Sequence, residues 1–454
     1  MALEVFPFQA DGAAWLAQRE RGGCLDQMGL GKTATAIRTV DLRRLNRGIV
    51  ICPANLRANW IGEFHKFAQY DRRICRGTTI HDYQAWRKGR FDVLVTSYEM
   101  AVRWAHLLRH QGEVLEFCVI DEWHYLKNPD ALRTKQILGN DSDGHRGILQ
   151  IAEQSWVLTG TLMPNDPMDC YSFLKFSRAL SLSKGDFRDY FMVERGTRTR
   201  PRPERVGDLQ ALIANNSIAR TEKDVGLELP PIWLTSMLVD GDTQQIRDFL
   251  AEYPGLDQSI IEAIAQGGLS FLDAQHIETL RRLLGEAKAI PYAEIIYDEL
   301  RTGLDKVVII AVHRKAMTLI HQYLLQRNIW SVMVHGDTKP KEREQAVHTF
   351  QSDKRCRVFV GQMTVVGIGQ TLHAAAAIDI FESAWSPGAN AQAIFRIRRI
   401  GQTRSMKARF ITLARTFEET LQKIVIDKTE TIAKLDKVRM LAAPLDDHPL
   451  PVLC

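Results

Sequence analysis

Two glycines, a lysine and a threonine near the start of the chain have the types and spacing of a phosphate-binding loop. The stretch runs from Asp26 to Thr33 and leads into a helical pattern. Gly29 and Gly31 let backbone N–H groups approach an anion without a Cβ in the way. Lys32 would then supply a cation for the β and γ phosphates, and Thr33 a hydroxyl for Mg²⁺. Asp26 stands where the commonest motif has its first glycine, so a glycine-rich helix start with a merely solvated lysine remains an alternative.

A second candidate element is an apolar run that ends in two carboxylates. Phe117–Asp121 has the composition of a buried strand, and Glu122 follows it directly. Open α/β sheets bind ligands at this end of their strands. Phosphoryl transfer needs a carboxylate near Mg²⁺ and a group that orients the attacking water, which suits Asp121 and Glu122 in that order. An acidic strand end is common in loops, but after a phosphate loop it favours nucleotide hydrolysis.

The rest of the chain must supply the strands and helices that position these groups. Short apolar runs alternate with helical patterns such as Thr33–Leu45 and Asn55–Ala68, which predicts an α/β fold with a parallel sheet. The strands expected in the first half are Gly48–Pro53, Phe91–Ser97, Phe117–Asp121, Trp156–Thr159 and Ser217–Ala219. A second alternating region predicts strands at Lys306–Val312, Ser331–His335, Arg357–Val360, Ala377–Phe381 and Ala408–Leu413. Two parallel-sheet domains therefore follow from the pattern.

The domain boundaries are expected at prolines and at changes of pattern. Two consecutive prolines close a first domain at 1–229, and a helical connecting segment is expected at 230–300. The second domain is expected at 301–440, followed by a frayed tail at 441–454. The segment 195–205 holds five arginines and is expected to be a loop or extended arm, either solvated or in contact with phosphates.

Composition limits the classes of protein and partner. The chain has 454 residues and a net charge of +5, which permits a polyanionic partner without requiring one. Its seven cysteines are scattered, with no C-x-x-C pair, so neither a zinc site nor a disulfide framework is expected. We see no secretion signal, and no apolar run approaches the roughly 18 residues of a membrane-spanning helix. A cytoplasmic or nucleoid-associated protein is expected.

Taken together in order, these segments resemble the Swi/Snf-type branch of the superfamily-two helicase-like ATPases. The main matches are Asp26–Thr33, the DEAH-like box Asp121–His124, Leu158–Thr161 and Gln392–Gln402. Lesser matches are Phe8-Gln9 with Gly12, Cys52-Pro53, Lys127–Pro129, Arg220 with Lys223, and Trp385–Gly388. The stretch Glu286–Pro291 is similar to the annealing-helicase subgroup of that branch.

The resemblance implies two RecA-like lobes, with ATP and Mg²⁺ in the cleft between them and double-stranded or branched DNA across both. The implied nucleotide-binding residues are Gln9, which reads adenine, and Met28, Gly29, Leu30, Gly31, Lys32, Thr33 and Gly369. The implied catalytic residues are Lys32, Asp121, Glu122, Arg396 and Arg399, with Thr33 and Asp121 on the metal and the two arginines as fingers from the second lobe. The implied coupling residues are His124, Thr159, Gly160, Thr161 and Gln392.

The implied activity is a DNA-dependent ATPase that translocates on duplex DNA, and a monomer is expected. Gln27, Leu162 and Gln370 depart from the family pattern, but none of these changes removes a group that touches phosphate or metal. Leu162 and Gln370 lie in segments that transmit closure, so they bear on coupling. A strand-separating DNA or RNA helicase is one alternative, and a non-hydrolysing DNA clamp is another. The interval between Gly367–Leu372 and the helix that carries Arg396 holds one expected strand, Ile378–Phe381, and leaves no room for a two-stranded strand-separating hairpin, which favours translocation without unwinding. Trp60 and Trp86 are expected to pack in the core or on a helix face, not to stack on bases.

Overall fold

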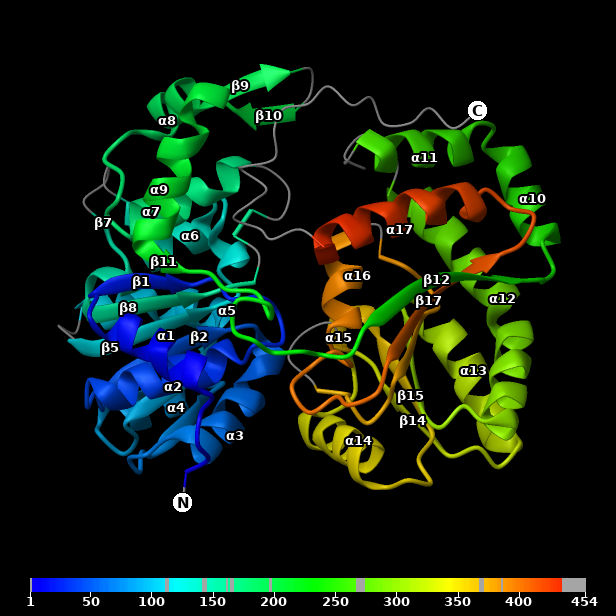
Figure 1. Ribbon diagram of the computed structural model, residues 1–454, viewed down its shortest axis with the longest axis horizontal. Coiled ribbons are helices and arrows are strands. Elements are labelled where there is room, and N and C mark those ends of the chain that lie inside the picture. The colour runs from blue at the N-terminus through cyan, green and yellow to red at the C-terminus, as the bar shows by residue number, and fades with distance from the viewer. Residues whose placement is uncertain are drawn as a thin grey trace. The chain divides into compact units, whose positions relative to one another are not determined.

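The computed structural model describes residues 2–110, 114–140, 145–160, 162–163, 167–195, 198–266, 274–366, 371–384 and 387–434. These residues form two compact units, 2–227 and 228–434, each with its own parallel sheet (Figure 1). The predicted α/β class with two parallel-sheet lobes is therefore confirmed. No helix in the described ranges combines the length and the hydropathy needed to cross a membrane. The predicted tail at 441–454 lies outside the described residues.

The first unit is built on a seven-stranded sheet in which every pair of neighbours is parallel. In spatial order the strands are β11 (Ser217–Ile218), β1 (Arg21–Cys24), β8 (Ala152–Leu158), β5 (Leu115–Asp121), β2 (Gly48–Cys52), β4 (Val93–Ser97) and β3 (Ile74–Gly77). The helices are α1 (Pro7–Ala17), α2 (Lys32–Leu42), α3 (Arg57–Phe67), α4 (Ile80–Arg87), α5 (Tyr98–His110), α6 (Leu132–Leu138), α7 (Tyr171–Phe176), α8 (Lys184–Phe191) and α9 (Val206–Asn216). Strands β2 and β4 are buried at every residue, which is typical of a parallel sheet with helices on both faces.

All five strands predicted for the first unit are present, but β1 and β3 were missed. The sequence of β1, Arg-Gly-Gly-Cys, has almost no apolar side chain and therefore no strand signal. Gly23 is small for a packing reason, because a Cβ there would lie 2.9 Å from the Phe173 ring. Because α7 packs closely against this strand, glycine occupies a position where a predictable strand would have an apolar side chain.

The arginine-rich segment forms part of a two-stranded antiparallel hairpin. Strand β9 (Met192–Arg195) pairs with β10 (Arg198–Pro201), and Figure 1 shows this hairpin beside α8. A second small hairpin joins β6 (Gly139–Asn140) to β7 (His145–Arg146). The expected extended arm is therefore paired rather than loose.

The described cysteines are buried and free of disulfides. Four of them lie on strands of the first sheet, namely Cys24 on β1, Cys118 on β5, Cys52 on β2 and Cys75 on β3. Burial raises the pKa of each of these thiols, to about 11 in the case of Cys75.

The second unit is built on a six-stranded sheet, again with every neighbouring pair parallel. The strand order is β12 (Ile232–Val239), β17 (Met406–Leu413), β16 (Ala377–Ile380), β13 (Val307–Ala311), β15 (Val358–Gln362) and β14 (Ser331–Val334). Its helices are α10 (Gln244–Glu252), α11 (Leu256–Gln266), α12 (Ala274–Thr302), α13 (Arg314–Gln326), α14 (Pro340–Ser352), α15 (Met363–Val366), α16 (Pro387–Ile394) and α17 (Glu418–Lys434).

The segment 230–300, predicted to be a helical connection, begins with a strand. Strand β12 pairs with β17 along its whole length and forms one edge of the second sheet. An edge strand leaves much of its surface to solvent, and Trp233 and Leu238 are 65% and 57% exposed. This mixed exposure hides the strand from a reading that looks for a buried apolar run.

The Glu286–Pro291 stretch lies within α12 and anchors that helix to the sheet. Lys288 is fully buried, and its ammonium donates hydrogen bonds to Glu418 Oε1 at 2.6 Å and to the carbonyl of Ile411 at 2.8 Å. The other carboxylate oxygen of Glu418 accepts from the Leu413 N–H. This buried ion pair thus joins α12, β17 and α17 inside one unit.

Candidate active site

Four strands of the first sheet end in a single row. Parallel pairing places Asp121 of β5 opposite Leu158 of β8, Leu158 opposite Cys24 of β1, and Cys24 opposite Ile218 of β11. The segments that follow these residues therefore emerge at one edge of the sheet. They carry the phosphate loop, Glu122, the Thr159-Gly160 pair and Arg220, so motifs far apart in sequence converge.

The phosphate loop has the backbone that its glycines predict. Gly29 and Gly31 have φ values of 96° and 76°, in the left-handed region that favours glycine. Gly31 is the N-cap of α2, so Lys32 and Thr33 begin the helix. The Lys32 ammonium donates to the carbonyls of Asp26 at 2.7 Å and Gln27 at 3.3 Å. The loop thus holds its own lysine where an anion would bind.

Gln9 of α1 lies against this loop. Its amide nitrogen donates to the Leu30 carbonyl at 2.9 Å, and its amide oxygen accepts from the Phe6 N–H at 3.0 Å. A Cβ on Gly31 would collide with the same amide. Gln9 therefore lies against the phosphate loop.

The departure at Asp26 is a structural anchor. Asp26 is fully buried, and the Arg220 guanidinium donates to it twice, at 3.1 Å to Oδ1 and 2.6 Å to Oδ2. The same arginine also donates to the carbonyl of Phe8, and a Cβ on Gly12 would touch it. Gln27, another departure, accepts from the Glu222 N–H. The Asp26–Arg220 ion pair thus holds the start of the loop, at the position where the commonest form of the motif has a glycine.

The carboxylate pair lies at the end of β5 in two different environments. Asp121 is 9% exposed, and its Oδ2 accepts a hydrogen bond of 2.8 Å from the indole N–H of Trp60. Burial, and then the charge of Glu122, raise the pKa of Asp121 to about 7. Glu122 has φ 61°, which is uncommon for a residue with a Cβ and turns the chain out of the strand. The hydroxyl of Tyr98 donates to the Asp121 carbonyl at 2.6 Å.

Trp60 is a site residue that sequence reasoning gave only a packing role. It is buried as expected, but its indole N–H also positions the predicted metal-binding carboxylate. No sequence signal points to this contact, because the two residues are 61 positions apart. Trp86, also buried, donates to the carbonyl of Asp92 and has no link to the site.

The predicted coupling residues of the first unit lie beside β1, the phosphate loop or the carboxylate pair. The Thr159 N–H donates to the Cys24 carbonyl at 3.1 Å, and Thr159 is fully buried. A Cβ on Gly160 would lie 2.7 Å from Met28 Cγ and 3.4 Å from the Lys32 ammonium, so this position requires a glycine. His124 Nδ1 lies 3.2 Å from Glu122 Oε2. Thr161 lies outside the described residues.

The remaining predicted site residues belong to the second unit. Arg396 follows α16 and is 5% exposed, and its carbonyl accepts from the Leu372 N–H. Arg399 donates to the hydroxyl of Thr371 at 3.0 Å. Gln392 is half-buried on α16. The segment Gly367–Gln370, with Gly369 and Gln370, lies outside the described ranges.

The first-unit edge has the donor set of a Mg²⁺·nucleotide site. The left-handed glycines put no Cβ on the loop, Lys32 supplies a cation at the start of α2, and Thr33 and Asp121 supply oxygens. Mg²⁺ is usually held by one or two carboxylates together with substrate phosphates. No group of three or more His, Cys, Asp or Glu side chains suited to a metal occurs in the part of the chain that was searched. One hydroxyl and one carboxylate suit a metal that also takes phosphate oxygens as ligands.

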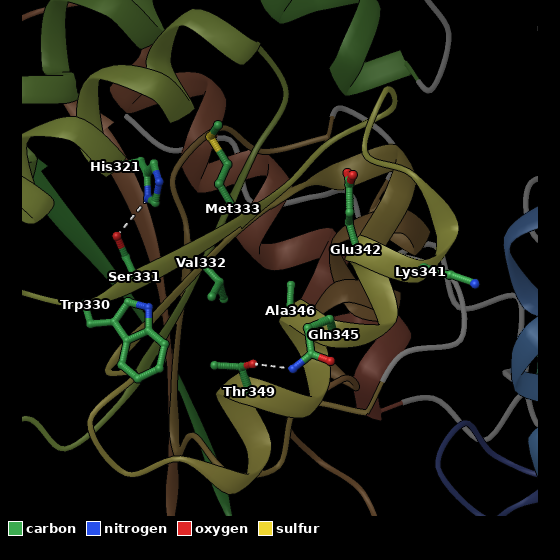
Figure 2. A pocket seen from close by; sticks show the side chains of 10 residues that line it. All are labelled: His321, Trp330, Ser331, Val332, Met333, Lys341, Glu342, Gln345, Ala346 and Thr349. Atoms are coloured by element: carbon green, nitrogen blue, oxygen red, sulfur yellow. Dashed lines mark hydrogen bonds between the residues drawn. The ribbon is translucent and has the colours of Figure 1, made fainter.

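A hollow of about 660 Å³ lies elsewhere, on the second unit between β14, α13 and α14 (Figure 2). Its lining includes His321, Trp330, Met333 and Thr349, and His321 Nδ1 lies 2.7 Å from the Ser331 hydroxyl. None of the predicted site residues belongs to this lining. The hollow is thus separate from the candidate active site.

Comparisons with known proteins agree with the resemblance read from the motifs. The family model "SNF2-related domain" matches residues 8–284, and "Helicase conserved C-terminal domain" matches 291–401. The chain is 24% identical over 446 residues to the SWI/SNF-related matrix-associated actin-dependent regulator of chromatin subfamily A-like protein 1 of Xenopus tropicalis, covering 96% of this chain and 45% of that protein. It is 25% identical to a probable chromatin-remodeling complex ATPase chain of Oryza sativa subsp. japonica, covering 94% and 40%.

Among solved structures, the chain is similar to a Sulfolobus solfataricus SWI2/SNF2 ATPase core in complex with dsDNA. The identity is 21%, the TM-score is 0.44, and 97% of each chain is covered. The chain spans less than half the length of the curated relatives named above. Because the SNF2-related model matches well over half of the residues, the chain belongs to the SNF2-related family of helicase-like proteins.

Proposed function

We propose that this chain is a DNA-dependent ATPase that moves along double-stranded DNA and remodels DNA junctions or protein–DNA complexes. The observation that carries the proposal is the row of four strand ends from which the phosphate loop, Glu122 and Thr159-Gly160 emerge together. The names of the relatives, which refer to chromatin remodelling and to a dsDNA complex, support DNA as the substrate track.

In this proposal each site residue of the first unit has a separate role in binding or hydrolysing Mg²⁺·ATP. Lys32 exchanges its two carbonyl partners for the β and γ phosphates, and Gln9 is close enough to the loop to read the adenine. Thr33 and Asp121 hold the metal, which neutralises phosphate charge. Glu122, turned out of the strand by its left-handed backbone, orients the attacking water and accepts its proton.

The raised pKa of Asp121 fits this assignment. A carboxylate with a pKa of about 7 is only partly ionised at neutral pH, and a bound cation favours its ionised form. Loading of the metal would therefore release a proton, and affinity for Mg²⁺·ATP would rise with pH through this range. The Trp60 hydrogen bond favours the ionised form in the meantime.

Arg396 and Arg399 are proposed to act as fingers from the second unit. A planar guanidinium that meets the γ phosphate only in the transition state accelerates hydrolysis without tightening ground-state binding. Gln402 holds this segment in shape, because its amide donates to the carbonyls of His373, Ala375 and Ile397.

A strand-separating helicase is the second candidate, and the second sheet argues against it. After β16, residues 381–384 form no strand, and α16 begins at Pro387. This interval leaves no length for a two-stranded wedge within the described residues. Without a wedge, nothing offsets the roughly 1.4 kcal/mol of stacking lost at each base-pair step. A non-hydrolysing clamp, the third candidate, gives no reason for Lys32, Asp121 and Glu122 to converge.

The test is the ATPase rate measured with no nucleic acid, single-stranded DNA, duplex DNA, forked DNA and RNA, using Glu122→Gln as the hydrolysis-deficient control. We expect the largest stimulation by duplex-containing DNA. Displacement of a third strand from a triplex, on the same preparation, tests translocation. Stimulation by single strands alone, or separation of a long forked duplex without triplex displacement, would replace this proposal by the helicase.

A further inference from the structure

The opposite edge of the first sheet also gathers segments that are far apart in sequence. Strands β3, β4 and β2 begin in one row, with Ile74 opposite Val93 and Val93 opposite Gly48, and β5 begins two residues before the partner of Gly48. The segments that precede these strands therefore lie side by side at the amino edge of the sheet, about 16 Å of strand away from the phosphate loop.

These segments are tied to one another by hydrogen bonds. The Arg47 guanidinium donates to the Trp86 carbonyl at 3.2 Å and lies 4.3 Å over the Trp86 ring. The Glu116 N–H donates to the Arg47 carbonyl at 2.9 Å, and the Asp92 N–H donates to the Arg73 carbonyl at 2.8 Å. The edge is thus a connected surface that holds its side chains in place.

Positive charge is concentrated on this surface. Segments 41–47, 71–73, 87–92 and residue 116 hold eight arginines and lysines against four carboxylates, whereas the whole chain has a net charge of only +5. Three of the carboxylates have local partners. Asp41 pairs with the buried Arg72, Asp92 pairs with Arg73 at 2.7 Å, and Glu116 accepts from the Asn46 N–H at 2.6 Å.

Four of the cations are exposed and have no local use. Arg43, Arg44, Lys88 and Arg90 form no side-chain hydrogen bond or ion pair among the residues that the structure describes. Because α2 ends at Leu42 and α4 at Arg87, one cation near each helix end is favoured by the helix dipole. That effect fades within a turn and gives no reason for further like charges on adjacent segments, which repel one another.

We propose that these four residues, here called the basic platform, bind the phosphate backbone of a second segment of duplex DNA, apart from the catalytic edge. Guanidinium groups match the geometry of phosphate oxygens. Arg44 and Arg90 precede neighbouring strands, and contacts from such residues to the phosphate backbone would not depend on the base sequence. Because β2 and β4 are neighbouring strands, the segments that carry the four cations enter the sheet about 5 Å apart, so the platform is one compact patch of positive charge. The choice of DNA rests on the proposed function, and the platform would hold one arm of a branched molecule.

The test compares two charge-matched variants in direct binding to fluorescein-labelled branched DNA over a range of salt concentrations. The platform variant carries Arg43→Gln, Arg44→Gln, Lys88→Gln and Arg90→Gln. The control carries Arg247→Gln, Arg301→Gln, Arg327→Gln and Lys354→Gln, four exposed positions dispersed over the second unit. Because each phosphate contact contributes about 0.9 to the slope of log K against log salt, we expect the platform variant to lose about 2 to 4 from that slope.

The affinity of the platform variant for branched DNA should fall about tenfold or more at physiological salt, while the control stays near wild type. ATPase activity on a short linear duplex should be unchanged. Equal weakening of both variants, or weakening of neither, overturns the proposal and leaves the cations as helix-end charges. Competition by polyglutamate as effective as that by DNA of equal charge would instead assign the surface to an acidic protein.

Two further measurements keep the result decisive. If the fourfold glutamine variant does not fold, the single variants Arg44→Gln and Arg90→Gln replace it, and each should lose up to about 0.9 from the slope of log K against log salt. A failure of the proposed function would give a different experimental result. It would appear as a wild-type ATPase that no DNA stimulates, whereas the platform is judged by the salt dependence of binding alone.

Discussion

Replacement of Asp121 by asparagine should stabilise the first unit while abolishing hydrolysis. Asp121 is almost fully buried, and burial raises its pKa from 3.8 to about 7. The folded protein therefore binds a proton that the unfolded chain releases, and stability falls as pH rises through this window. Asparagine has nearly the same shape, its carbonyl oxygen accepts the Trp60 N–H as Asp121 does, and it never ionises.

The size of the effect follows from that pKa difference. At 1.36 kcal/mol for each pKa unit, ionisation of Asp121 costs the folded state about 4 kcal/mol at pH 8. At pH 5 the carboxyl is protonated in the folded state but ionised in the unfolded chain. This difference lowers the free energy of unfolding by about 2 kcal/mol. Asp121→Asn should thus be more stable than wild type by these amounts, with the gap widening by roughly 2–3 kcal/mol between the two pH values.

The assay is chemical unfolding without nucleotide and with a metal chelator, followed by tryptophan fluorescence. The fully buried tryptophans Trp60, Trp86, Trp123 and Trp156 all lie in the first unit, so the signal reports on it. Asp92→Asn is the control, because the Arg73 hydrogen bonds lower the pKa of Asp92. That variant should lose stability at pH 8 and recover relative to wild type as the pH falls. A pH-independent gap between Asp121→Asn and wild type would refute the buried-charge reasoning.

Four further outcomes follow from the site. Lys32→Ala should lower kcat by about a thousandfold, because no other side-chain cation of the loop meets the phosphates, and near-normal turnover would contradict the assignment. Glu122→Gln should still bind Mg²⁺·ATP in a filter assay but hydrolyse it about 10²–10⁴-fold more slowly, and an equal loss of binding would make Glu122 structural. Arg399→Ala should lower kcat by about 10³-fold with little change in nucleotide affinity, so unchanged turnover with saturating DNA would exclude a finger. Arg220→Ala should destabilise the first unit by about 3–5 kcal/mol because it leaves Asp26 buried and unpaired, and a melting curve like that of wild type would show that the pair carries no stability.

The chemical residues were accessible from sequence because each lies in a short segment with its own local signal. The phosphate loop combines glycines with a lysine, and Asp121 and Glu122 follow an unbroken apolar strand. Both signals depend on neighbouring residues and on strand periodicity, which a single sequence contains.

The supporting contacts were not accessible, because they depend on tertiary structure. Asp26 and Arg220 are 194 positions apart, and neither residue type indicates the other. The Trp60 hydrogen bond to Asp121 depends on how α3 packs against the sheet. Strands β1 and β12 were not predicted, for opposite reasons. Strand β1 has glycines, against which Phe173 packs, in place of apolar side chains, and β12 is an edge strand with exposed Trp233.

The rate at which the buried thiols of the first sheet react with a labelling reagent would report how fast each strand of that sheet opens. Cys24, Cys118, Cys52 and Cys75 each sit on a different strand, buried and protonated at neutral pH, so an alkylating reagent reaches a given thiol only after its strand has separated from its neighbours. Pulsed labelling read by peptide mass spectrometry would therefore time the release of each strand separately. Cys24 lies two residues before the start of the phosphate loop, so its labelling should slow first when a nucleotide binds, and it would report occupancy without any engineered probe.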